Sequence, residues 1–561
     1  MKRVIALSCA AACGAFVAAS SSPAAPAFEY LDKLGLYDAA HTDADGSHES
    51  ILSASSYVGW FAGVSTHYVG TVEGTEEVPA VNQTGWTYSP WGETARPGLY
   101  YGKYQTSSGG HDTRILGINT QGMSYGNSVR FDPTDRPRGV SAWWADRNGT
   151  TIPMGLTPIT MNEAGLVAGQ YENAPDQAAI FFITGWIQLG RQDIAPYWYV
   201  HDMNESGATI LNATSKPDAS GARQGAGAWF CAYRESPIRI GLTGPEYTHP
   251  TDGDTNMPLL LSDSGYVAGI AAKGPGWHAV AWLRAPDGTT RRLGEDYAYA
   301  DFTPRILNNA GYVIGTTTGP NPGQESYWVQ SPQGEPRRIG VYDSEHTLGR
   351  LSFNTVERFT DSGFATGNAG RVGPMGRSGP GSGQDAFVAW RGGSTRLLAL
   401  TDATHRRDDG YRFSTAEGVT ESGFVWGSSA RYGGTSSAKG QTAWIYDCTQ
   451  RTMQPLVFSV RSCDGYAWSK VTTVLKNGTA LGYYTRFVGN TDTGMRAFAW
   501  VPGQGFLKID VSMDVAIRDA GWQYFQEAQT GTRDPWIAGA GRLDEPGYSQ
   551  GVFLVKLNAT P

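Results

Sequence analysis

The eight residues SDSGYVAG at 262–269 are one copy of a phrase that recurs about ten times along the 561-residue chain. Five further clear copies are NEAGLVAG at 162–169, NNAGYVIG at 308–315, TDSGFATG at 360–367, TESGFVWG at 420–427 and LKNGTALG at 475–482, and weaker copies stand at 56–63, 119–126, 204–211 and 532–539. The copies are spaced by roughly 53 residues, which is the length of one propeller blade rather than of one domain. A unit of this length cannot bury its own apolar face, so the copies must pack on one another.

The composition fits many short strands joined by tight turns. Charged residues make up 17% of the chain, whereas glycine (73 residues) and aromatic residues (12%) are abundant. Globular domains typically carry about 25% charged residues, and aromatic residues and glycines are typical of strands and turns respectively. No helical pattern of 10–15 residues alternates with the strands, so a parallel βαβ fold is not expected.

One repeat, residues 308–359, predicts four strands in sequence. A turn at 308–311 precedes strands expected at 312–318, 326–330, 337–341 and 351–359. Four short antiparallel strands with Gly, Pro and Asn between them are typical of a propeller blade. The first glycine of the phrase is expected in a turn that needs positive φ. The second lies inside the strand, where close packing of neighbouring blades is the expected reason.

The two ends of the sequence resemble complementary parts of one blade. The tenth copy offers strands at 536–541 and 551–557, residues 31–36 resemble the third strand at 395–400, and 49–52 would follow as the fourth. We therefore expect residues 28–55 to complete the last blade and to remove an exposed sheet edge. The predicted fold class is all-β: a β-propeller of four-stranded antiparallel blades with about ten repeats. Two smaller propellers, or one copy that is not a full blade, are the alternatives.

The first 27 residues have the pattern of a secretory signal. Lys2 and Arg3 precede an apolar stretch at 4–19, and small residues at 25–27 suit cleavage. We predict a signal peptide at 1–27, a propeller domain at 28–561, and a secreted or periplasmic protein. No later segment reaches about 18 unbroken apolar residues, so no integral membrane segment is expected after signal removal.

The charge pattern argues against nucleic acid and anionic membranes as partners. The net charge is −8, and removal of Lys2 and Arg3 with the signal would make it −10. The charges of both signs are dispersed, without a basic stripe.

Three cysteines remain after the signal. Cys448 and Cys463 fall within one repeat, on segments predicted to be neighbouring strands, so a disulfide between them is expected in an oxidising compartment. Cys231 is left over and is expected to be a buried thiol.

A second phrase recurs in the second strand after each turn. It reads HAVAW at 278–282, AFVAW at 386–390 and AFAW at 497–500. The two phrases together resemble those of the HAF-repeat family of extracellular repeat proteins, over roughly residues 50–555. Only residues 277–279 keep the histidine of the family name. The resemblance implies architecture and an extracellular location, not a chemistry.

Three Asp-x-x-His loops occupy equivalent positions in different repeats: Asp38 with His41, Asp343 with His346, and Asp402 with His405. A metal site would need several ligands converging on one ion. Equivalent positions in different blades are spread round a ring, so we predict a repeated turn-stabilising hydrogen bond from side chain to backbone instead.

No cofactor is predicted, with calcium as the alternative. Acidic turns at 43–46, 252–254 and 408–410 could supply some of its oxygen ligands, but Asp-Gly is also an ordinary turn pair. No nucleophile elbow, metalloprotease motif or phosphate-binding loop occurs.

Four tryptophans are the candidate ligand-binding residues: Trp86, Trp91, Trp143 and Trp198. Their rings could form a platform on which sugars stack, although tryptophans in a propeller also pack between blades. The predicted function is therefore a monomeric, non-catalytic binding or surface-interaction module for a glycan or an extracellular protein. The alternatives are a polysaccharide lyase or glycoside hydrolase with its site in a loop-lined cleft, and a structural envelope component.

Overall fold

The computed structural model describes residues 28–68, 82–183, 185–190, 197–214, 226–249, 253–273, 278–294, 302–317, 326–334, 336–348, 351–372, 383–434, 437–458, 462–503, 505–509, 515–532, 536–545 and 549–557. The predicted signal peptide at 1–27 lies outside these residues.

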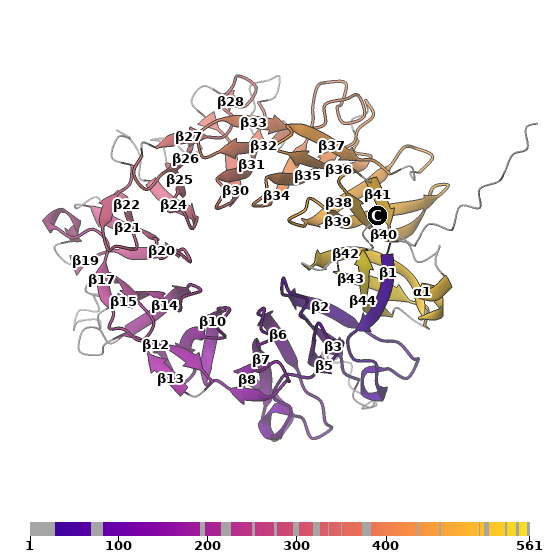
Figure 1. Cartoon of the computed structure of the whole chain (residues 1–561), viewed down its shortest axis with the longest axis horizontal. Coiled ribbons are helices and arrows are strands. Elements are labelled where there is room, and N and C mark those ends of the chain that lie inside the picture. Colours follow the sequence, from indigo (N-terminus) through magenta and orange to yellow (C-terminus); the bar gives the residue numbers. More distant parts are fainter. Residues whose placement is uncertain are drawn as a thin grey trace, which may run out of the picture.

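Ten four-stranded antiparallel blades follow one another round a single axis in this part of the chain (Figure 1). The predicted all-β propeller is confirmed, and one ring replaces the alternative of two smaller ones. Two successive blades, β34–β37 and β38–β41, are joined into one sheet by a short parallel pairing of β36 with β38.

The strands of each blade run in order from the axis outward. The innermost strands are β2 (Ser50–Ser55), β6 (Thr113–Ile118), β10 (Leu156–Met161), β14 (Tyr197–Met203), β20 (Met257–Leu261), β24 (Phe302–Leu307), β30 (Asn354–Phe359), β34 (Ser414–Val419), β38 (Ala467–Val474) and β42 (Trp522–Gly531). The second strands are β3 (Phe61–Thr66), β7 (Ser124–Phe131), β11 (Val167–Tyr171), β15 (Thr209–Thr214), β21 (Val267–Lys273), β25 (Val313–Thr317), β31 (Phe364–Gly370), β35 (Phe424–Ala430), β39 (Ala480–Val488) and β43 (Trp536–Leu543).

The third strands are β4 (Gln83–Tyr88), β8 (Pro137–Ala145), β12 (Ala174–Phe182), β16 (Ala226–Cys231), β22 (His278–Arg284), β26 (Ser326–Gln330), β32 (Gln384–Trp390), β36 (Gly440–Asp447), β40 (Thr491–Val501) and β44 (Gln550–Leu557). The outermost strands are β5 (Thr94–Ala95), β9 (Thr151–Pro153), β13 (Gly185–Gln188), β17 (Ile238–Ile240), β23 (Thr290–Arg292), β27 (Arg337–Ile339), β33 (Thr395–Leu398), β37 (Thr452–Leu456), β41 (Gly505–Lys508) and β1 (Phe28–Leu34).

The connections carry a few short elements. Two small hairpins pair β18 (Thr248–His249) with β19 (Gly253–Asp254) and β28 (Thr347–Leu348) with β29 (Leu351–Ser352). The short helices are η1 (Ala39–His41), η2 (Gly102–Tyr104), η3 (Pro245–Tyr247) and α1 (Val515–Asp519). Among the helices of the described residues, none has the length and apolar composition needed to cross a membrane.

The N-terminal strand closes the ring. β1 pairs antiparallel with β44, from Phe28 opposite Leu557 to Leu34 opposite Val552, and Trp522 Nε1 donates to Tyr30 Oη at 3.2 Å. The prediction that residues 28–55 complete the last blade is confirmed for 28–34. The predicted fourth strand at 49–52 belongs elsewhere, because β2 pairs with β3 and opens the next blade.

In every repeat the predicted unit is shifted by one strand from the observed blade. The predicted strands at 312–318, 326–330 and 337–341 are found as β25, β26 and β27, but the strand predicted at 351–359 is found as β30, which pairs with β31 of the following blade. The phrase marks the turn between the first and second strands of a blade, so a unit counted from the phrase begins one strand too late.

The polar residue that opens the phrase links neighbouring blades. Asn162 Oδ1 accepts from Leu166 N at 3.0 Å and so caps its own turn, and Asn162 Nδ2 donates to Glu205 O of the next blade at 3.2 Å. Asn119 donates to Glu163 O in the same way at 3.1 Å. The phrase therefore stabilises its turn and the ring at the same time.

The two glycines of the phrase are required for different reasons. Gly265 has φ of 89°, as the turn prediction requires. A Cβ on Gly269 would lie 2.3 Å from the Trp282 ring and 2.4 Å from Met257 O. Trp282 and Met257 belong to the same blade as Gly269, so the close contact is within a blade and not, as predicted, between blades.

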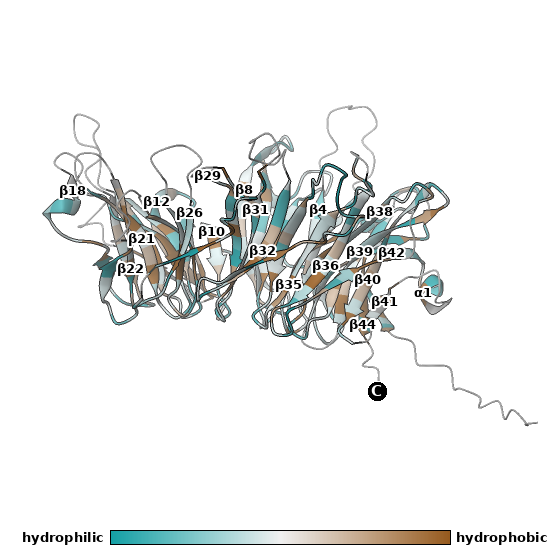
Figure 2. Ribbon diagram, turned by 90° about the horizontal axis from the view of Figure 1, so that it is seen from above, coloured by the Kyte–Doolittle hydropathy of each residue, from teal (hydrophilic) through white to brown (hydrophobic). Residues whose placement is uncertain are grey.

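The apolar core lies between successive blades. One cluster, for example, joins Ile210, Ala228 and Ile240 of one blade to Val267 and Trp282 of the next. Figure 2 shows the ring edge-on, with β18 and β29 at one face and β44 reaching the other. We call the first the loop face, because the links between blades and between second and third strands lie there, and the second the turn face.

Candidate binding site

Three Asp-x-x-His loops each link an outermost strand to the next blade at the loop face. In each loop the aspartate contacts the histidine Nδ1, and the histidine Nε2 contacts a side chain at the start of the next blade's third strand. We call these contacts the His junctions: junction one is Asp38, His41 and Thr84 (2.7 and 2.9 Å), junction two is Asp343, His346 and Asp385 (2.6 and 3.0 Å), and junction three is Asp402, His405 and Thr442 (2.7 and 2.8 Å).

The predicted turn-stabilising bond is present at all three junctions. The aspartate accepts from the backbone N–H two residues later at 3.0, 2.9 and 2.8 Å, at Ala40, Glu345 and Thr404. The second bond of each histidine, which joins two blades, was not predicted. It links positions some 40 residues apart, which the spacing within one loop does not indicate.

The backbone of the next blade follows the same course at each junction. The residues that precede the loop histidine, Ala40, Glu345 and Thr404, each accept from a backbone N–H that follows a second strand, at 2.9, 2.7 and 2.7 Å. Gln83 and Gln384, the first residues of β4 and β32, form parallel bridges to Asp112 and Phe413, which directly precede β6 and β34. Gln441 of β36 pairs in the same way with Trp468 of β38. The three junctions can therefore be compared residue by residue.

One position differs in a way that opens a pocket. The residue that precedes the bridge partner of Gln83, Gln384 and Gln441 is His111, Arg412 and Ala467, respectively. His111 Nε2 contacts Thr84 Oγ1 at 2.7 Å, and the Arg412 guanidinium donates to both oxygens of Asp385 at 2.6 and 2.7 Å. Ala467 has no side chain that could reach Thr442. A pocket of about 480 Å³ lies at this place.

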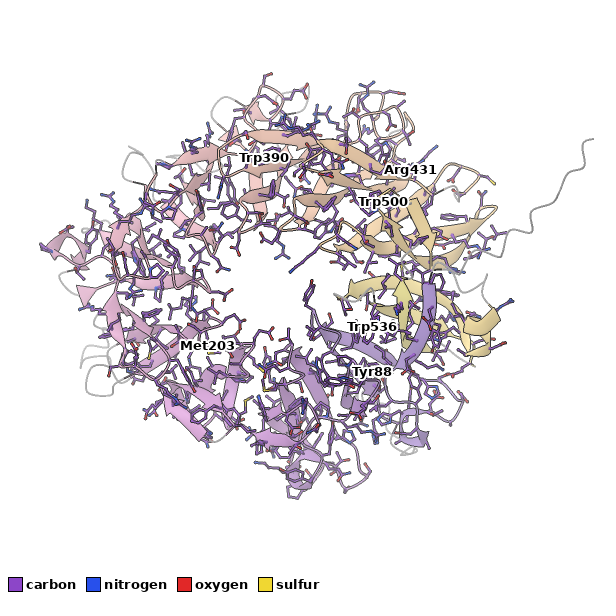
Figure 3. All side chains as sticks on the ribbon, in the orientation of Figure 1. Tyr88, Met203, Trp390, Arg431, Trp500 and Trp536 are labelled. Carbon is purple, nitrogen blue, oxygen red and sulfur yellow. The ribbon has the colours of Figure 1, made fainter. Side chains whose placement is uncertain are left out.

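Both polar and aromatic side chains line the pocket. Asp402, His405, Arg431 and Thr442 come from junction three and the hairpin beside it, Phe458 comes from the connection into the next blade, and Trp468 comes from β38 of that blade. Figure 3 labels Arg431 at this blade. Phe458 is held in place by stacking on Tyr484, with ring centroids 4.3 Å apart.

The charges in the pocket are balanced. Burial lowers the pKa of His405 below its ordinary value, despite its bond to Asp402, so the imidazole is neutral at neutral pH. Burial alone would raise the pKa of Asp402, but the bond and charge of His405 hold it below its usual range. Arg431 Nη1 donates to Thr442 Oγ1 at 3.1 Å. The pocket thus presents one carboxylate, one guanidinium and one neutral imidazole.

The Asp402–His405–Thr442 chain has the order of a hydrolase relay. Thr442, however, is only 2% exposed, and its hydroxyl already contacts His405 and Arg431. Junction one holds the same chain in a place where His111 fills the space beside it. The chain therefore links two blades, and its hydroxyl is buried and already bonded to two side chains.

Three of the four predicted tryptophans cannot form a ligand platform. Trp86 and Trp143 are 0% exposed and Trp198 is 2% exposed, so their rings pack within the core. Core and platform tryptophans follow the same strand pattern, which is why the sequence did not separate them. Trp91 is 69% exposed in the turn after β4 and lies edge-on to Trp60 at 5.5 Å. Its role as a binding residue remains a prediction.

The predicted disulfide between Cys448 and Cys463 is not formed, and both residues are free thiols. The start of β36, Gly440, pairs with Ala467, four residues after Cys463, whereas Cys448 follows the far end of β36. Eight residues of strand span about 26 Å, and a disulfide needs Cα atoms within about 7 Å. Neither cysteine lies within a strand, and the two flank the neighbouring strands β36 and β38 at opposite ends. Cys231 is the predicted buried thiol, at 3% exposure.

The acidic turns bind their own backbone. Asp43 accepts from Asp45 N and Ser47 N at 3.0 and 2.6 Å, and Asp409 accepts from Tyr411 N at 3.0 Å. Asp252 lies outside the described residues. Within the described ranges, no group of three or more His, Cys, Asp or Glu side chains could hold a metal ion.

Comparison with known proteins finds only distant structural similarity. No family model matches the chain, and no curated protein matches it. The propeller domain of the Trilobed protease from Pyrococcus furiosus is 9% identical, with 63% of this chain and 98% of that chain covered and a TM-score of 0.30. Dipeptidyl peptidase 4 from Porphyromonas gingivalis is 12% identical, with 93% and 65% covered and a TM-score of 0.33. Virginiamycin B lyase from Staphylococcus aureus is 10% identical, with 66% and 98% covered and a TM-score of 0.27. At such identities the similarity gives no information about the chemistry of this chain.

Proposed function

We propose that this chain is an exported HAF-repeat propeller, secreted or periplasmic, that binds a glycan without converting it. It acts as a monomer, through the pocket beside Ala467. The observation that carries this proposal is the alanine itself: two junctions fill the position with His111 or Arg412, and the third leaves about 480 Å³. Concave sites of about this size with aromatic walls and a few polar groups are typical of small-ligand sites.

The chemistry of the pocket suits a sugar ring. The Phe458 and Trp468 rings offer apolar surface, and Phe458 is fixed by its contacts with Tyr484 and Phe498 at 4.3 and 4.9 Å. Aromatic rings pack on the apolar face of a sugar, while nearby polar groups orient its hydroxyls. The Asp402 side chain, 58% exposed, is an acceptor at the edge of the pocket.

Binding without conversion is favoured by the burial of Thr442. A covalent mechanism needs a nucleophile that the substrate can reach. Thr442 is only 2% exposed, and its hydroxyl contacts His405 and Arg431. The pocket lies on a rigid ring among connections between strands, which is where such scaffolds usually recognise ligands.

The test is retention of the purified protein on a polysaccharide array, read for bound protein and for new reducing ends. Ala467→His should lower retention at least about tenfold, because it reproduces at junction three the side chain that fills junction one. Ala467→Ser is the matched control, since it leaves the pocket open, and both variants should melt within a few degrees of the native protein.

Three results would contradict the proposal. Unchanged retention of Ala467→His would remove the pocket as the site. New reducing ends would favour the polysaccharide-degrading alternative. If an extracellular protein retains the propeller and no glycan does, the ligand is a protein and not a glycan.

A further inference from the structure

A second pocket faces the axis of the ring on the same strand as the first. It has a volume of about 590 Å³ and is lined by residues of three successive blades. Glu357 and Arg358 come from β30, Glu417 from β34 with Trp426 behind it on β35, and Lys470 from β38.

Strand β38 joins the two pockets. Ala467, Trp468 and Ser469 line the pocket at the loop face, and the next three residues, beginning with Lys470, line the one at the axis. Trp468 and Lys470 are two residues apart and point to the same face of the strand, about 7 Å from each other along it. Both are half-buried, while Ser469 between them is buried. One continuous face of β38 therefore runs from the first pocket to the second.

Trp426 is larger than the residues at its position in the two neighbouring blades. It pairs with Gly418, and a Cβ on this glycine would lie 2.2 Å from the indole ring. The equivalent residues of the blades on either side, Thr366 and Leu481, are smaller. The missing side chain of Gly418 makes room for the indole over the innermost strand, where it is half-buried and lines the pocket.

Acidic and basic groups surround this indole in equal number. Glu357 and Glu417 occupy equivalent β-bulge positions of adjacent blades. Lys470 Nζ lies 4.0 Å from the Glu417 carboxylate, and Ser428 Oγ donates to the same carboxylate at 3.3 Å. With Arg358, the pocket holds two acids and two bases. The first pocket is balanced as well, with Asp402 and Arg431.

We infer that the two pockets are subsites of one groove along β38, and that the ligand is an extended neutral polysaccharide. This inference rests on the proposed glycan-binding function and specifies its substrate class. Each subsite has an aromatic wall, Trp468 in one and Trp426 in the other, beside hydrogen-bonding groups of both signs. A polyanionic chain would require an excess of basic groups, which the lining residues do not provide.

The test measures affinity against chain length. Cello-, manno- and xylo-oligosaccharides serve as the neutral series, with oligogalacturonates as the anionic comparison, in calorimetric titrations. Affinity for the neutral series that binds should rise with length until both subsites are filled and then level off. Trp426→Ala should lower the affinity for long oligosaccharides about tenfold and leave that for the shortest bound ones unchanged.

Two surface variants guard against a folding defect. Glu357→Gln and Lys470→Met alter the second subsite without removing a core side chain, and each should weaken only the long oligosaccharides, by several-fold. Ala467→His should weaken short and long ones alike. If affinity does not grow with length, or if the axis variants act equally on short and long chains, the groove is wrong while the proposed function stands. Preference for oligogalacturonates, or no binding to any neutral series, overturns the inference.

Discussion

At the scale of single residues, three junctions with the same backbone differ in their chemistry. Junction one brings together the neutral imidazoles of His41, His67 and His111, with ring centroids 5.3 and 4.4 Å apart. Junction two replaces the hydroxyl of Thr84 with the carboxylate of Asp385, which accepts from His346, Arg371 and Arg412. Junction three has no large side chain at Ala467. Side chains at one repeated position thus produce a hydrogen-bonded cluster, a charged network and a pocket.

The charged network should be the most sensitive of the three to loss of one partner. Burial alone would raise the pKa of Asp385, but the His346 hydrogen bond and the guanidinium groups of Arg412 and Arg371 hold it well below its ordinary value. Asp385→Ala leaves these cations without their buried partner and should lower the free energy of unfolding by about 3–5 kcal/mol. Urea denaturation measures this. Thr84→Val at junction one is the control and should lower the free energy of unfolding by about 1 kcal/mol. Equal losses in the two variants would contradict the prediction that the charged network is the more sensitive junction.

The imidazoles of junctions one and two should respond to pH with opposite signs. Burial, and then the neighbouring His67, lower the pKa of His111 to about 4. Because an unfolded histidine titrates near pH 6.5, His111 stabilises the fold above that pH, and this stabilisation is lost as the pH falls towards 4. His346, whose pKa is raised by Asp385 and Asp343 against the effect of burial, stabilises the fold below pH 6.5 and less as the pH rises through its folded pKa.

His111→Gln should therefore reduce the acid sensitivity of the protein. Between pH 7 and pH 5 the native protein should lose about 2 kcal/mol more of its unfolding free energy than the variant does. Urea denaturation of both proteins at the two pH values gives the comparison. His346→Gln is the reciprocal control, and it should make the acid loss larger; a His111→Gln variant with the native pH profile would show that this group does not titrate as described.

At the scale of elements, the second glycine of the phrase sets the spacing within a blade. A Cβ on Gly427 would lie 2.0 Å from Thr415 O and 2.6 Å from the Trp444 ring. Gly427→Ala should therefore force the blade apart locally and lower the free energy of unfolding by about 1–3 kcal/mol. Thermal and urea denaturation measure the loss. Gly392→Ala is the matched control, because nothing lies within 4 Å of that Cβ position and its φ is not in the left-handed region, so it should be nearly neutral.

Much of the element pattern could be predicted from the sequence, and the misses have physical reasons. The phrase identified the turns because polar residues such as Asn162 cap them and glycines such as Gly265 supply positive φ. Both features are local. The blade boundary, the ends at which Cys448 and Cys463 lie, and the burial of Trp143 depend on pairing between strands, which local pattern does not specify. The pocket was missed because Ala467 is informative only when set beside His111 and Arg412 in space.

At the scale of the whole molecule, the ring depends on one strand from the other end of the chain. β1 covers the edge of β44, and its Leu34 is fully buried against the first blade. Removing residues 28–34 would expose the backbone of β44 as an unpaired edge, a common site of association between chains, and the loss of Leu34 alone costs about 2–5 kcal/mol.

The truncated protein should consequently melt lower and form larger species, as measured by calorimetry and size-exclusion chromatography with light scattering. Tyr30→Phe removes only the hydrogen bond to Trp522 and is the control. It should cost about 1 kcal/mol and leave the protein monodisperse. A truncated protein with the native melting temperature and elution would contradict the closure of the ring by this strand.

The pairing of Phe28 with Leu557 also orders the events of biosynthesis. Residues 28–34 must wait until β44 has been synthesised before they meet their neighbour. The other blades can form from contiguous sequence, but the ring cannot close before β44 has been synthesised. A nascent chain interrupted anywhere between β1 and β44 would leave the sheet edges at both ends of its row of blades uncovered, so synthesis of β44 is the step that protects these edges from self-association.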